Sequence, residues 1–277
     1  MLPMFLESGM TLYKKRAKKA FMKFRVLGCS GGQIPGYNLS SFLIDDSLLI
    51  DAGSATSVLG LKAQQKIKNI LITHVHLDHV MGLATIADNL YGNCQSTINV
   101  WGINDVISAL KSSLFNDTIW PDFTQITDDS QDWPVLSFHN LPEEEPMPIG
   151  NSTVTAVRVN HIVPSVAFFI ENHQKTLLHV GDTGPTEKVW AVARRKKNLC
   201  VVVLEASFPN RLQDVADMSR HLTPRTLAQE ADKLRRPSVP ILVTHLKPQF
   251  REEIVAELKR LKGYRLRILK QGDSLVF

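Results

Sequence analysis

The stretch that decides the fold of this 277-residue chain is Ile70-Leu71-Ile72-Thr73-His74-Val75-His76-Leu77-Asp78-His79. Its first four residues are apolar or β-branched, which predicts a buried strand. From Val80 onward, apolar residues recur at helical spacing. Three histidines and one aspartate therefore lie where the end of a strand meets the start of a helix.

These polar residues are of the types that bind metal ions. In an extended segment, His74 and His76 can point the same way because side chains alternate with a period of two. Asp78 and His79 follow at the point where the backbone turns into the helix. Imidazole and carboxylate together suit zinc or a similar first-row divalent ion. Four candidate ligands in one short turn indicate two ions in one pocket rather than a single tetrahedral site.

Composition and charge exclude several classes of protein. Hydrophobic residues make up 44% of the chain and charged residues 21%, as in an ordinary globular protein. The net charge of +5 favours anionic ligands, but Lys and Arg are spread over many segments, unlike a nucleic-acid-binding surface. No apolar run approaches the roughly 18 residues that a membrane span requires. Three isolated cysteines, Cys29, Cys94 and Cys200, argue against a disulfide framework and favour a reducing, cytoplasmic compartment.

The chain divides into an extension and one domain. Residues 1–21 contain a basic cluster without the apolar stretch of a secretory signal, so we expect a poorly ordered arm. Phe24–Leu27 predicts the first strand, which makes Met22 a candidate natural start. We expect a catalytic domain over residues 22–277, and the polar stretch 115–150 is interpreted as an insertion or lid.

The order of elements predicts an α/β sandwich with helices outside. Ser41–Ile44 and Leu48–Ile50 predict a hairpin that ends at Asp51-Ala52-Gly53, and the later strands lead to Gly181-Asp182-Thr183-Gly184. This weak internal symmetry indicates two similar halves packed face to face. Further strands are expected at 98–101, 154–159, 166–170, 176–180, 199–204, 240–244 and 266–269, and helices at 55–65, 104–114, 223–234 and 252–261.

Three more candidate ligands directly follow predicted strands. They are His161, Asp182 and His245. Each has the same context as His74, a polar residue after an apolar run. Strand ends on one edge of a sheet converge in space, so a shared site is expected.

At this point the chain resembles the metallo-β-lactamase superfamily, whose HxHxDH motif matches residues 74–79. The resemblance implies a four-layer αβ/βα sandwich with a cleft for two metal ions, zinc first and manganese as the alternative. It implies that one ion is held by His74, His76 and His161, and that the other is held by Asp78, His79 and His245. Asp182 would bridge the two ions, and Asp51 would support the loop by hydrogen bonds.

Other segments are similar to the class II cyclic-nucleotide phosphodiesterases. They are Gly28–Gly32, His76–Leu83, Phe115-Asn116 with Ile119-Trp120-Pro121, Glu205–Asn210, His221–Pro224 and Thr244–Pro248. The similarity implies hydrolysis of the 3′,5′-cyclic phosphodiester of cAMP or cGMP by a hydroxide held between the two ions. Asp78 would also accept a proton from this water. His221 is the candidate general acid, with Glu205 holding its charge; the alternative is that His221 caps the following helix.

Competing interpretations remain open. A tRNA 3′-end processing endonuclease would share the metal residues and the Glu205–His221 pair, but the chain has no glycine-rich or basic arm for tRNA. A thioester or lactam hydrolase fits less well. A non-catalytic zinc scaffold would need only four closed ligands, usually cysteines. We expect a small cyclic nucleotide as partner, no stable nucleic-acid partner and no membrane association; a homodimer stays open.

Overall fold

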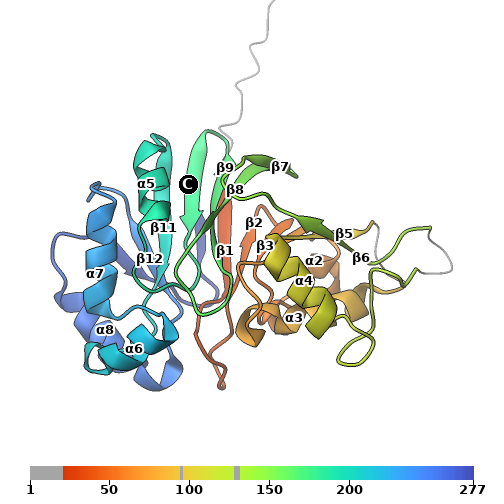
Figure 1. Ribbon diagram of the computed structural model, residues 1–277, viewed down its shortest axis with the longest axis horizontal. Helices are drawn as coiled ribbons and strands as arrows, with labels where there is room; N and C mark the ends of the chain where they lie inside the picture. Colours follow the sequence, from red (N-terminus) through yellow and green to blue (C-terminus); the bar gives the residue numbers. More distant parts are fainter. Residues whose placement is uncertain (1–20, 94–95, 128–131) are drawn as a thin grey trace, which may run out of the picture.

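The computed structural model describes residues 21–93, 96–127 and 132–277. Two seven-stranded sheets form its centre, and helices cover their outer faces (Figure 1). One helical layer contains α1 (Ala55–Val58), α2 (Leu61–Gln64), α3 (Leu77–Leu90) and α4 (Asn104–Ser113). The other contains α5 (Lys188–Arg195), α6 (Gln213–Ser219), α7 (Pro224–Lys233) and α8 (Arg251–Arg260), with 3-10 turns at Asn210–Leu212 and Pro248–Phe250. The predicted four-layer sandwich is confirmed.

The first sheet has the strand order β14-β1-β2-β3-β4-β5-β6. Its strands are β14 (Ser274–Val276), β1 (Lys23–Gly28), β2 (Ser41–Ile44), β3 (Leu48–Ile50), β4 (Asn69–Leu71), β5 (Ile98–Gly102) and β6 (Leu136–Asn140). The predicted hairpin is present, since Ile44 pairs with Leu48 across a turn in which Asp45 and Asp46 have positive φ. From β3 to β6 the pairing is parallel, so the carboxyl ends of these strands share one edge.

The second sheet has the order β13-β12-β11-β10-β9-β8-β7. Its strands are β13 (Leu266–Ile268), β12 (Ile241–Thr244), β11 (Leu199–Glu205), β10 (Lys175–His179), β9 (Val166–Asn172), β8 (Ser152–Arg158) and β7 (Met147–Ile149). Strands β10 to β13 are parallel. A hydrogen bond of 3.1 Å from the Val166 amide to the Thr73 carbonyl joins the second sheet to the loop after β4. The carboxyl ends of both parallel sets therefore meet.

Two apolar clusters hold the layers together. The first lies between the sheets and under α3, and the second packs the outer face of the second sheet against α5, α7 and α8. Phe42 of β2 links the sheets, because its ring stacks on Phe24 at 5.5 Å and contacts the His179 ring of β10 at 5.1 Å. The central strands are continuous apolar runs, and successive side chains point to opposite faces, so Val201 and Val203 join the first cluster while Val202 and Leu204 join the second.

Several elements differ from the sequence-based expectation. The helix expected at 55–65 is divided into α1 and α2, because Gly60 is extended and interrupts the hydrogen bonds. Within 115–150, β6 and β7 are edge strands of the two sheets, so this stretch is not wholly an insertion. Strand β14 and helices α5 and α6 were also missed, since each is short, with three, eight and seven residues. The predicted basic arm falls on residues 1–20, outside those described.

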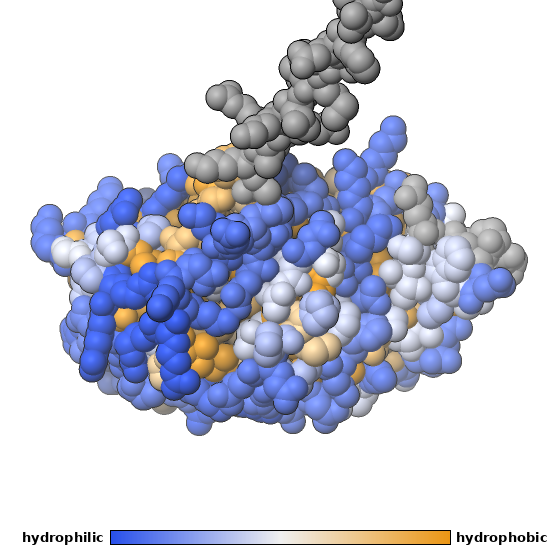
Figure 2. All heavy atoms as spheres, turned by 90° about the horizontal axis from the view of Figure 1, so that it is seen from above, coloured by the Kyte–Doolittle hydropathy of each residue, from blue (hydrophilic) through white to orange (hydrophobic). Residues whose placement is uncertain are grey.

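The surface is mainly hydrophilic on the face seen from above, where hydrophobic side chains form small separate patches (Figure 2). Within the described ranges, no helix has the length and apolar character that crossing a bilayer demands.

Replacing Phe42 by Ala should remove the aromatic contact between the sheets. Its side chain is fully buried, so we expect a loss of about 3–5 kcal/mol in the free energy of unfolding. Urea denaturation measures this loss. Tyr91→Ala is the control, because Tyr91 is 47% exposed and its truncation should change stability by about 0.5 kcal/mol or less. Equal losses in the two variants would contradict the assignment.

Candidate metal centre

The predicted ligands lie where strands end. His74 and His76 follow β4, and Asp78 and His79 occupy the first turn of α3. The other three follow strands of the second sheet: His161 after β8, Asp182 after β10 and His245 after β12. Because these ends meet at one edge of the sandwich, all seven side chains are close in space. They form the metal cluster, a name used below for these seven residues.

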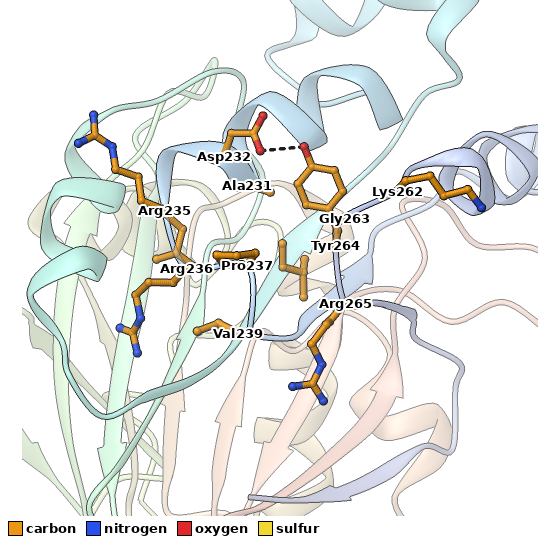
Figure 3. Close-up of a pocket in the computed structure, with 12 residues that line it drawn as sticks. Ala231, Asp232, Arg235, Arg236, Pro237, Val239, Lys262, Gly263, Tyr264 and Arg265 are labelled. Carbon is orange, nitrogen blue, oxygen red and sulfur yellow. Dashed lines mark hydrogen bonds between the residues drawn. The ribbon is translucent and has the colours of Figure 1, made fainter.

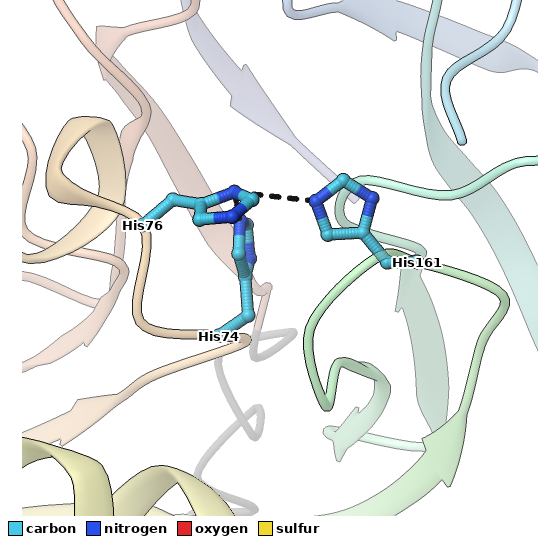
Figure 4. Close-up of side chains that lie close together, drawn as sticks. All are labelled: His74, His76 and His161. Carbon is cyan, nitrogen blue, oxygen red and sulfur yellow. Dashed lines mark hydrogen bonds between the residues drawn. The ribbon is translucent and has the colours of Figure 1, made fainter. Parts of the chain in front are cut away.

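The first half of the cluster consists of three imidazoles, whose facing nitrogens all lie within 4.8 Å of one another. His76 presents its Nδ1 atom, 3.1 Å from His74 Nε2 and 3.2 Å from His161 Nε2. Figure 4 shows the rings of His76 and His161, which come from different segments of the chain, pointing toward one another. Three such nitrogens could hold one ion.

The second half contains Asp78, His79, Asp182 and His245, again within 4.8 Å. The Nε2 atoms of His79 and His245 are 3.3 Å apart. His245 Nε2 also lies 3.2 Å from Asp78 Oδ2. This half offers two imidazoles and one carboxylate besides Asp182.

Asp182 is the side chain that touches both halves. Its Oδ2 atom is 3.8 Å from His74 Nε2 in the first half. The same oxygen lies 3.3 Å from His79 Nε2 and 3.2 Å from His245 Nε2 in the second half. One carboxylate is thus within reach of two neighbouring ions.

The donor set fits divalent metal ions. Five imidazoles and two carboxylates, without a thiolate, suit zinc or manganese. Four of the imidazoles use their outward nitrogen in a polar contact, which leaves the inward nitrogen free to bind. These contacts are His74 Nδ1 to Thr73 Oγ1 at 3.0 Å, His79 Nδ1 to Asp51 at 2.7 Å, His161 Nδ1 to the Arg220 carbonyl at 3.1 Å and His245 Nδ1 to Ser207 Oγ at 2.9 Å.

Asp51 orients two ligands at once. Its buried carboxylate accepts hydrogen bonds from the Thr73 amide at 2.8 Å and from the Thr73 hydroxyl at 2.8 Å. It also faces His79 Nδ1 at 2.7 Å. Since the Thr73 hydroxyl donates to Asp51, it can accept from His74 Nδ1, and so one carboxylate sets the ring orientation of both His74 and His79.

Electrostatics keep the carboxylates charged. Burial disfavours the charge of Asp182, but the imidazoles of His245 and His79 outweigh burial and hold its pKa well below the ordinary value. For Asp78, burial is likewise outweighed by His245 and His79, which lower its pKa. Both groups are therefore anionic near neutral pH, the form that binds a cation.

The histidines divide into two kinds. Burial lowers the pKa of His74 and of His161, so both are neutral near pH 7. At His79 burial also opposes charge, but the carboxylates of Asp182 and Asp51 raise its pKa well above the ordinary value. Binding of a cation at His79 must therefore release a proton.

A buried acidic and basic pair adjoins the cluster. Glu205, at the end of β11, lies with its Oε1 atom 2.7 Å from His221 Nδ1. Glu205 also accepts from the Thr183 amide at 3.0 Å and from the Ser207 hydroxyl. Burial lowers the pKa of His221, but the Glu205 carboxylate outweighs it and raises the pKa to about 9. His221 is thus a protonated imidazole beside a metal cluster.

Comparison with known proteins agrees with this site. The family described as cAMP phosphodiesterases class-II matches residues 60–272. The chain belongs to the class-II cAMP phosphodiesterase family. A probable 3′,5′-cyclic-nucleotide phosphodiesterase from Yersinia pestis is 28% identical over 91% of this chain and 88% of the relative. Ribonuclease Z from Archaeoglobus fulgidus is 23% identical over 87% of this chain and 92% of the relative.

Solved structures agree on the architecture. Unliganded yeast PDE1 superposes with a TM-score of 0.79 at 20% identity, over 93% of this chain and 99% of that one. YhfI from Bacillus subtilis, a metallo-β-lactamase fold protein, gives a TM-score of 0.74 at 19% identity, over 93% and 100%. The chain therefore has the metallo-β-lactamase fold, and its family is one of hydrolases that act on phosphodiesters.

Sequence reasoning on this phosphodiesterase missed three supporting residues. Thr73 and Ser207 link ligand histidines to the buried carboxylates of Asp51 and Glu205. Arg220 holds His161 from a helix end. Thr73 and Ser207 stand inside the quoted motifs, where a hydroxyl beside a ligand could have signalled support, but no pattern marks Arg220.

The structure also shows the roles of two further residues near the cluster, His179 and Thr223. His179 is packed in the interior, since it is 2% exposed and burial lowers its pKa to about 4. Thr223, not His221, caps α7, because the Thr223 side chain accepts from the Thr226 amide. The alternative role of His221 as a helix cap is therefore wrong.

A separate cavity of about 250 Å³ lies between the end of α7 and β13. Tyr264 donates to Asp232 at 2.8 Å inside it, while Arg236 and Arg265 extend away from it (Figure 3). Both arginines donate to main-chain carbonyls. None of the seven residues of the metal cluster lines this cavity.

Replacing Asp51 by Asn should weaken metal binding without removing a ligand. The amide cannot accept from both Thr73 and His79, so we expect metal affinity to fall about 10–100-fold. Competition with a chromophoric chelator measures the affinity. Asp88→Asn is the control, since Asp88 is exposed on α3. Unchanged affinity in Asp51→Asn would contradict the orienting role.

Proposed function

We propose that this chain hydrolyses the 3′,5′-cyclic phosphodiester of cAMP, cGMP or both to the 5′-nucleotide. Its cofactors would be two divalent ions, with zinc as the first choice and manganese as the alternative. The observation that carries the proposal is the convergence of seven metal-binding side chains beside the Glu205–His221 pair. Membership of the class-II cAMP phosphodiesterase family supports the substrate class.

The seven residues of the metal cluster would form two groups, one for each ion. His74, His76 and His161 would hold one ion, Asp78, His79 and His245 the other, and Asp182 would bridge them. When bound, the ions would lower the pKa of a water shared between them and polarise a phosphoryl oxygen. Asp78, which is anionic and 28% exposed at its side chain, faces the cleft and is placed to accept a proton.

Charge in the cleft matches the substrate. Two divalent cations exceed the charge of the Asp78 and Asp182 carboxylates, so the loaded site is positive. A cyclic phosphodiester carries one negative charge and is attracted to it. The net charge of +5 on the chain adds to this attraction.

His221 supplies the proton that the leaving group needs. Hydrolysis breaks the bond between phosphorus and the ribose 3′-oxygen, and that oxygen must be protonated as it leaves. His221 is charged near neutral pH because of Glu205, and its ring lies 5.1 Å from the His161 ring. A positioned imidazolium of this kind accelerates such a step about 10²–10⁴-fold.

A second candidate is a tRNA 3′-end processing endonuclease. The similarity to Ribonuclease Z from Archaeoglobus fulgidus over most of the chain favours it. The same cluster and acid would cut a linear phosphodiester, so the substrate distinguishes the two. A non-catalytic zinc scaffold is disfavoured by the two open groups of ligands.

The proposal is tested by assaying the metal-loaded protein with cAMP, cGMP and a precursor tRNA. We expect the 5′-nucleotide from at least one cyclic nucleotide, no cleavage of the tRNA, and loss of activity with a chelator that zinc or manganese restores. Asp182→Ala, which lacks the shared ligand, should be inactive. Cleavage of tRNA alone would support the second candidate, and two bound ions without any hydrolysis would support the scaffold.

The pH dependence should report on His221. The acid is protonated below a pKa of about 9, so kcat/KM should fall as the pH rises through that value; bound cations lower the pKa and move the fall to lower pH. In His221→Ala we expect kcat to drop about 10²–10⁴-fold and the alkaline fall to disappear. Metal content, measured by elemental analysis, should be unchanged. Loss of metal would instead make His221 a ligand.

A further inference from the structure

His161 lies outside any helix or strand. It lies in the connection between β8, which ends at Arg158, and β9, which begins at Val166. His79 is held within α3, and His245 directly follows β12. The next residue, Ile162, is 53% exposed. Such a connection needs an external contact to hold one imidazole in place.

Arg220 makes contact with both parts of His161. The Arg220 carbonyl faces His161 Nδ1 at 3.1 Å, so that the ring donates its proton outward. The Arg220 guanidinium donates through Nη1 to the His161 carbonyl at 2.7 Å. One residue thus fixes the ring orientation and the main chain of this ligand.

The main chain at Arg220 is arranged for this contact. Arg220 ends α6 in the left-handed conformation, with φ 51° and ψ 57°. Glycine is the usual residue at such a helix end, because a Cβ atom makes this conformation unfavourable. An arginine is less favourable than glycine in this conformation, but its side chain makes a hydrogen bond to the His161 carbonyl that glycine could not make.

The same turn carries the acid. His221 directly follows Arg220, its amide donates to the Ala216 carbonyl at 2.8 Å, and its ring faces Glu205. The end of α6 therefore determines the distance between a metal ligand and the proton donor.

We propose that Arg220 is a positioning residue that holds His161 in the first half of the metal cluster, next to His221. The inference rests on the proposed two-ion function. Removing the side chain should therefore weaken the binding of the ion held by His74, His76 and His161. The binding of the ion held by Asp78, His79 and His245 should not change.

The experiment compares four proteins: wild type, Arg220→Gly, Arg220→Lys and Arg194→Ala. Arg220→Gly keeps the carbonyl that faces His161 and suits the left-handed backbone conformation, so a lower affinity would report the loss of the side chain. Arg220→Lys retains one donor that can reach the carbonyl. Arg194→Ala is the matched control, because Arg194 Nη1 also donates to a carbonyl at 2.7 Å, that of Lys233, away from the cluster.

Zinc affinities are measured by chelator competition, and cobalt substitution reports the coordination geometry by absorption. In Arg220→Gly we expect one affinity to fall about 10–100-fold and the other to stay unchanged, with an altered cobalt spectrum and a lower kcat on the cyclic nucleotide. Arg220→Lys should recover part of the affinity, and Arg194→Ala should match wild type.

Two results would overturn the inference alone. One is that Arg220→Gly binds both ions with wild-type affinity, and the other is that Arg220→Gly and Arg194→Ala lose the same affinity for both ions. A wild-type protein that binds fewer than two ions would instead overturn the proposed function, and the inference with it.

Discussion

The buried carboxylate of Asp51 is the group on which the metal cluster depends. Imidazole nitrogens that face one another at 3.1 and 3.2 Å can bind one cation only if each presents a lone pair to it, so the other nitrogen of each ring must carry the proton. Asp51 sets the ring orientation of His79 directly and that of His74 through Thr73. Its main chain has φ 53°, a conformation that non-glycine residues adopt rarely and that surrounding contacts must maintain.

Close approach of the backbone completes this arrangement on the other side. His245 also has positive φ, and its amide donates to the Cys29 carbonyl at 2.8 Å. A Cβ atom on Gly31 would lie 2.6 Å from His245 Nδ1, so only glycine fits there. The glycine loop after the first strand therefore serves the packing of a ligand histidine.

Two buried carboxylates, Asp51 and Glu205, make the hydrogen bonds that support the histidines from outside the metal cluster. Glu205 holds His221 and, through the Ser207 hydroxyl, reaches His245. Asp51 supports the histidines that come from the first sheet. Each half of the sandwich thus carries its own buried acceptor at the end of a strand. The side chains of the metal cluster and His221 are thus oriented by buried hydrogen bonds.

The sequence by itself determined the layered α/β class, most strands, and which residue types could bind metal. It did so because strand periodicity and a dense ligand motif are local features. Tertiary structure alone decided that β6 and β7 are edge strands, that the helix expected at 55–65 is broken, and that Arg220 meets His161. These outcomes depend on pairing between segments far apart in the chain. Arg220 and His161, for example, are 59 positions apart and become neighbours only when the end of α6 meets the connection between β8 and β9.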